Sequence, residues 1–148
     1  MSLEKWVEHG WLKREPTSPD EIQGLLSVVN RGLADSKVEA ISTDLRFIAA
    51  FNSALAAATV ALRASGYRTA TQAGHHVRTI ESLEFTLPDG QRFIQKLKVL
   101  SNKRNRSSYD VAGVVSDQDL QSAMKLASQL TKELQVWLKT EHANLLVA

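Results

Sequence analysis

A long apolar segment runs from about Ser42 to Gly66 and leaves few choices of fold. Its larger apolar residues recur at helical spacing, and alanines fill most of the positions between them. This pattern predicts a helix whose small side chains let other helices approach it closely on several sides. We therefore expect this segment to form the central helix of the fold.

Four further segments show helical periodicity and are separated by turns that contain proline, glycine or small polar residues. They cover approximately residues 18–35, 71–83, 91–106 and 116–142. Ser18 and Glu21 have the spacing of a capping box, with Pro19 at the first helical position. Asp117 and Asp119 are expected to be charges in the first turn of the last helix. Because the connections are short, we expect an all-α, up-and-down helical bundle of four to five helices.

The chain has 148 residues, 43% of them hydrophobic, which predicts a single domain over residues 1–148. Within it, residues 1–16 are expected to form a short helix or turn that packs Trp6 and Trp11 on the bundle. Because cysteine is absent, packing must replace disulfide bonds, as is usual in a cytoplasmic protein. The charged N-terminus and the lack of a continuous apolar run predict neither a signal peptide nor a membrane-spanning segment.

The formal net charge of +2 and the pI of about 9.0 are too mild to indicate nucleic-acid binding. Basic residues nevertheless gather on the helix expected at 91–106. A helical wheel places four of them within about 80° of one another: Arg92, Lys96, Lys103 and Arg106. They form either a solvated face with cations near the helix C-terminus, or a strip that contacts nucleic-acid phosphates.

Arg104 differs from these residues because the same wheel places it with the apolar Phe93, Leu97 and Leu100. A guanidinium on an apolar face is costly to bury unless a carboxylate, a carbonyl or a ligand phosphate meets it. Arg104 therefore indicates either a structural ion pair or a site at an interface.

His75 and His76 are adjacent in the sequence, so on a helix their side chains point about 100° apart. They cannot act as the paired metal ligands that residues four apart can form, and we expect no metal site. One of them is expected to face the core, or else to lie beside Arg104 and act as a base.

The segment from Arg104 to Asp110 resembles the signature of HEPN domains, which are RNA- and nucleotide-directed helical bundles. That signature is an arginine followed, after a short spacer, by a histidine, often with asparagine directly after the arginine. Arg104, Asn105 and the spacing match, whereas Tyr109 stands in the place of the histidine. Several branches of the superfamily have a tyrosine followed by an aspartate at this point. The order of the helices is also similar over most of the chain.

The resemblance implies an RNA- or nucleotide-binding protein of a toxin–antitoxin or defence system. In HEPN ribonucleases the arginine and histidine of two protomers meet across a dimer interface and cleave RNA without metal. By this resemblance the chain would be a homodimer without a cofactor, with Arg104, Asn105 and Tyr109 in its site. Asp110 would belong to the same pocket as His75 and His76.

Cleavage and binding remain separate expectations. If the protein is an enzyme, the resemblance makes it a metal-independent endoribonuclease. Tyrosine, with a pKa of about 10, is a poor base at neutral pH, which favours binding through Tyr109 without cleavage. The alternative is a noncatalytic helical interaction module that partners a small nucleotidyltransferase, in which Arg104 would form an ion pair.

Overall fold

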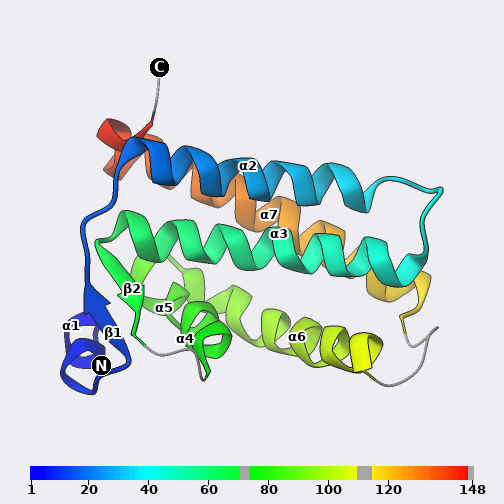
Figure 1. Ribbon diagram of the computed structural model, residues 1–148, viewed down its shortest axis with the longest axis horizontal. Helices are drawn as coiled ribbons and strands as arrows, with labels where there is room; N and C mark the ends of the chain where they lie inside the picture. The colour runs from blue at the N-terminus through cyan, green and yellow to red at the C-terminus, as the bar shows by residue number, and fades with distance from the viewer. Residues whose placement is uncertain (71–73, 110–114, 147–148) are drawn as a thin grey trace.

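The computed structural model describes residues 1–70, 74–109 and 115–146, without the side chains of 106–109, and it is mostly helical. Its long helices alternate in direction along the chain, as Figure 1 shows. They are α2 (Pro19–Ser36), α3 (Thr43–Ala64), α6 (Ile94–Tyr109) and α7 (Asp117–Glu141). The expected all-α helical bundle is confirmed.

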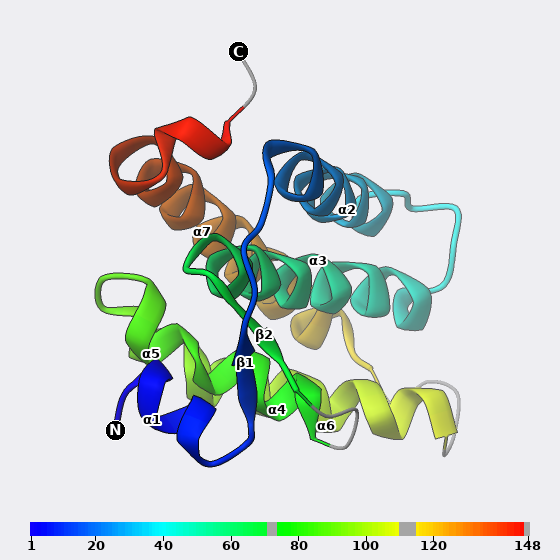
Figure 2. The ribbon, with the colours of Figure 1, turned by 60° about the vertical axis from the view of Figure 1, so that its left-hand side comes forward.

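Helix α3 lies at the centre of the bundle, with α2 on one side and α6 on the other (Figures 1 and 2). It packs most extensively against α2 and α7. Its alanines are largely buried, and Ser53 donates a hydrogen bond of 2.6 Å to the carbonyl oxygen of Val29 in α2. At this crossing a Cβ on Gly32 would lie 2.8 Å from the Ala49 carbonyl oxygen. Helices α2 and α3 can therefore approach this closely only because residue 32 is a glycine.

The length and composition of α3 would also suit a membrane span, because the helix has 22 residues and its most apolar 18-residue window reaches a mean hydropathy of 1.6. The sequence pattern does not suggest such a span, because polar and charged residues interrupt the apolar run. More than half of the most apolar window is buried inside the bundle, at 56%. The core helix of a soluble protein meets the same criteria, so this feature is weak evidence for a membrane.

The N-terminal residues pack on one end of the bundle. Helix α1 (Leu3–Glu8) buries Trp6, whose ring meets Phe85 edge to face with centroids 5.4 Å apart. Strand β1 (Leu12–Arg14) then pairs antiparallel with β2 (Tyr67–Thr69), which follows α3. We did not expect strands, because segments this short and this far apart carry no alternating pattern that a sequence can display.

The helix expected at 71–83 is divided in the structure. Residues 71–73 lie outside the described part, α4 covers His75–Glu81, and α5 covers Leu83–Thr86. Between them the Ser82 hydroxyl donates to the Thr79 carbonyl oxygen at 2.6 Å. The next helix begins as the 3₁₀ turn η1 (Gly90–Phe93) and continues as α6.

Serine caps start three of the long helices, α2, α3 and α7. Ser116 and Asp119 form a full capping box, and Asp117 and Asp119 lie in the first turn of α7, as predicted. The capping box expected at Ser18 is only half formed. Ser18 accepts from the Glu21 amide, but the Glu21 carboxylate binds other partners instead of the Ser18 amide.

Candidate functional site

The buried face of α6 contains an arginine. Phe93, Leu97 and Leu100 are at most 7% exposed, and Arg104, which shares their face, is half-buried. The Nε atom of Arg104 is buried and has no hydrogen-bond partner among the described residues. A buried guanidinium N–H without an acceptor is costly and gains most from an anionic ligand.

Helix α4 packs against α6 and carries the adjacent histidines, whose rings meet edge to face with centroids 4.1 Å apart. The pKa of His76 is lowered, first because part of its ring is shielded from water. His75 and the positive charge of Arg104 lower it further. Segments far apart in the sequence thus bring His76 and Arg104 close enough to affect each other electrostatically.

The lowered pKa of His76 predicts a pH-dependent stability. Folding favours neutral His76, so its contribution is present above the unfolded pKa of about 6.5 and is lost as the pH falls through the lower folded value. We expect the free energy of unfolding to fall more steeply below about pH 6.5 in the wild type than in His76→Gln. Urea unfolding at a series of pH values measures both slopes. Equal slopes would contradict a depressed pKa.

Two residues of the basic strip, Arg92 and Lys103, are tied to α7. Arg92 pairs with Glu133 and lies 3.6 Å from Asp89, and Lys103 lies 3.4 Å from Asp119. These contacts hold α6 against α7 and occupy the cations with carboxylates of the same fold. For Arg92 and Lys103 they favour the structural alternative over an open strip of phosphate ligands.

Helix α6 continues without a break to Tyr109. On a regular helix, backbone positions five residues apart lie about 140° apart around the axis, and Arg104 and Tyr109 have this spacing. Asn105 is exposed. The side chains of Arg106 and Tyr109, and the whole of Asp110, lie outside the described residues. The joint site expected from the resemblance, in which residues of two protomers meet, stays a prediction.

A pocket of about 460 Å³ opens between the strand pair, α3 and α4. Both histidines line it, together with Arg68 of β2 and Lys13 of β1. Lys13 was not among the expected site residues, because only the pairing of the two short strands brings it to the histidines.

A scan against protein-family models, a search of curated proteins and a search of solved structures each find no match. The HEPN resemblance thus rests on the motif at Arg104 and on the order of the helices.

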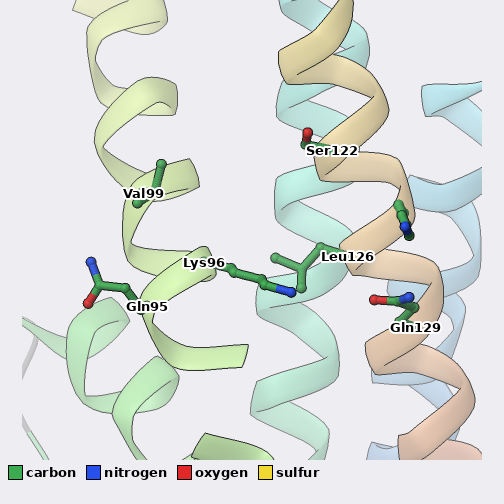
Figure 3. Close-up of a pocket in the computed structure, with 7 residues that line it drawn as sticks. Gln95, Lys96, Val99, Ser122, Leu126 and Gln129 are labelled. Atoms are coloured by element: carbon green, nitrogen blue, oxygen red, sulfur yellow. The ribbon is translucent and has the colours of Figure 1, made fainter. Parts of the chain in front are cut away.

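A second concave surface, the α6–α7 groove, has a volume of about 430 Å³ and is drawn in Figure 3. Lys96 extends from α6 toward Leu126 of α7, with α3 behind them. Val99 at its edge is 55% exposed. The described lining contains Lys96 and Lys125 and no acidic residue. The groove combines an apolar surface with positive charge.

Proposed function

We propose that the protein binds RNA or a nucleotide through phosphate contacts at the seam between α4 and α6. The observation that carries this proposal is the buried Nε atom of Arg104, which has no acceptor within the described residues. A phosphate oxygen would supply that acceptor and a negative charge together, and guanidinium groups bind phosphates with paired hydrogen bonds. The resemblance to HEPN domains supports RNA as the source of the phosphate, and a toxin–antitoxin or defence role and a homodimer rest on that resemblance.

If the bound RNA is cleaved, His76 is a better base than Tyr109. A histidine with a lowered pKa is neutral at pH 7 and can accept the proton of a ribose 2′-hydroxyl. The 2′-oxygen then attacks the adjacent phosphorus, and the 5′-oxygen of the next nucleotide leaves with a proton taken from water. Arg104 would neutralise the negative charge that grows on the phosphate. The products are a cyclic 2′,3′-phosphate and a 5′-hydroxyl end.

Removing the Arg104 side chain should weaken RNA binding. We expect Arg104→Ala to raise the dissociation constant for a single-stranded RNA about 10- to 100-fold, the effect of one lost charge-assisted contact. Fluorescence anisotropy with a labelled oligonucleotide at fixed salt measures it. The exposed Arg31 of α2 provides the control, because Arg31→Ala removes the same charge away from α4 and α6.

Equal losses of RNA affinity in Arg104→Ala and Arg31→Ala would indicate that net charge alone attracts the RNA, and would contradict a site at Arg104. Cleavage is tested on the same RNA in the presence of a chelator. Loss of cleavage in both Arg104→Ala and His76→Gln, with binding retained in His76→Gln, would support the endoribonuclease. Binding without cleavage would support a noncatalytic RNA-binding protein.

The α6–α7 groove favours a second candidate function, the helical interaction module. Its exposed Val99 and its two lysines suit a partner helix with an apolar stripe and acidic flanks. The nucleotidyltransferase partner expected from the sequence is one such candidate. Absence of RNA and nucleotide binding, together with a complex that Val99→Asp disrupts, would favour this function over the first.

A further inference from the structure

The pocket between the strand pair and α4 is lined by positive charge. Lys13, Arg63 and Arg68 contribute to its wall together with the two histidines, and none of the described lining residues is acidic. Its apolar wall comes from α3, where Leu55 and Leu62 lie. The pocket therefore offers cations on one side and hydrocarbon on the other.

The arginines of this pocket are held in place by two carboxylates behind them. Arg63 donates to Glu21 at 2.7 Å, and Arg68 pairs with both Glu15 and Glu21. Lys13 forms no ion pair among the described residues, so three cations face two carboxylates and an excess positive charge remains. The site is preorganised, because the arginine planes are fixed before any ligand arrives.

The hydroxyl groups of the pocket are mostly used inside the fold. Thr59 donates to the Leu55 carbonyl oxygen at 2.9 Å and Thr79 to that of His75 at 2.8 Å. These two hydroxyls cannot donate to a ligand at the same time. The cationic side chains are therefore the main groups that can recognise a ligand, and they select for negative charge.

We propose that this pocket binds a phosphomonoester, either the terminal phosphate of an RNA or that of a free mononucleotide. This inference deepens the proposed function and rests on it. A phosphomonoester carries about −1.5 to −2 charge at pH 7, whereas a phosphodiester within a strand carries only −1, so the excess positive charge favours the end of a strand. The volume of about 460 Å³ exceeds what a phosphate alone requires and falls within the range of small-molecule sites. The leucines would contact the ribose or base.

Binding of a dianion should be coupled to proton uptake. The groups that face His76 are His75 and Arg104, and Lys13 and Arg68 lie across the pocket. Burial, His75 and Arg104 disfavour a proton on His76 in the empty pocket, and a bound dianion would favour one. Binding should therefore take up a proton at about pH 7.5, where the phosphomonoester is itself dianionic, and calorimetry in buffers of different ionisation enthalpy should detect this uptake.

The test uses the full chain and two sets of probes in isothermal titration calorimetry. The first set is adenosine 5′-monophosphate, adenosine and inorganic phosphate. The second is one RNA oligonucleotide with a 5′-phosphate, a 3′-phosphate or hydroxyls at both ends. We expect the monophosphate to bind and adenosine not to bind, and one phosphorylated oligonucleotide to bind at least tenfold tighter than the unphosphorylated one. Preference for the free monophosphate over both oligonucleotides would assign the ligand as a mononucleotide.

Lys13→Ala is the main variant, since Lys13 is exposed and takes no part in the arginine network. We expect it to weaken binding of the phosphorylated probe about tenfold, the effect of one charge-assisted contact. Lys37→Ala is its matched control, because Lys37 is also exposed and lies at the far end of α2 (Figure 1). His76→Gln should abolish the proton uptake while retaining part of the affinity.

Several results would overturn this proposal. The first is that adenosine binds as tightly as its monophosphate. The second is that Lys13→Ala and Lys37→Ala lose the same affinity for the phosphorylated probe. The third is that RNA binds equally well with and without a terminal phosphate. The last result, combined with a loss of RNA binding in Arg104→Ala, would leave the proposed function intact and remove only the pocket. Binding of the monophosphate without any RNA binding would instead keep the pocket and refute the RNA form of the proposed function.

Discussion

Arg63→Ala should lower the free energy of unfolding by about 3 kcal/mol. Arg63 is 4% exposed, and its guanidinium donates five hydrogen bonds, two of them to Glu21. The others reach the carbonyl oxygens of Glu15, Pro16 and Tyr67 at 3.0 to 3.1 Å. The alanine variant removes this donor from three part-buried carbonyl oxygens, and the connection from β1 to α2 loses its attachment to α3.

The estimate is at the lower end of the range for buried ion pairs, because the Glu21 side chain is 31% exposed and keeps Arg68. Urea unfolding followed by far-ultraviolet circular dichroism measures the change. Arg31→Ala, at an exposed position of α2, should change stability by less than about 0.5 kcal/mol. Arg63→Lys should remain clearly destabilised, because an ammonium cannot make five fixed contacts. Full stability of Arg63→Lys would show that charge alone matters here.

Gly90→Ala should also destabilise the fold by about 3 kcal/mol, near the top of the range for overpacking. Gly90 is buried at the start of η1, and a Cβ there would lie 2.1 Å from the carbonyl oxygen of Leu83 and 3.2 Å from the Cβ of Leu87. The obstacle is backbone, so no rotation of a side chain relieves it. The segment from α5 to α6 must move and disturb the packing of Phe93.

Gly24→Ala is the matched control, and it should have the opposite sign. Gly24 lies inside α2, and a Cβ there would meet no packing neighbour within 4 Å, so alanine adds helix propensity without a clash. We expect a gain of up to about 1 kcal/mol. Thermal and urea unfolding of the two variants test the pair together. Similar effects of both substitutions would show that the contact at Gly90 relaxes freely.

The prediction of a buried apolar face is confirmed, and it depended on a single helix. The wheel of residues 91–106 placed Arg104 with Phe93, Leu97 and Leu100, and the structure buries that face. Arg63 carries the same signal, an arginine inside the alanine-rich helix 43–64, and it was overlooked. The two arginines differ in their hydrogen bonding. Arg63 is fully paired, whereas the Nε atom of Arg104 has no acceptor in the described chain.

The helices and the residues at which they begin could be predicted from the sequence, because caps such as Ser116 and apolar periodicity depend on a few neighbouring positions. What those residues left open was decided by contacts between distant segments. Arg63 donates hydrogen bonds to Glu21, 42 residues away in the sequence, and to the Glu15 carbonyl oxygen, 48 residues away. Arg92 donates to Glu133, 41 residues away. Whether a cation is available to a ligand thus depends on which carboxylate or carbonyl group the folded chain brings to it. A pattern of neighbouring residues does not show which distant segment will supply that group.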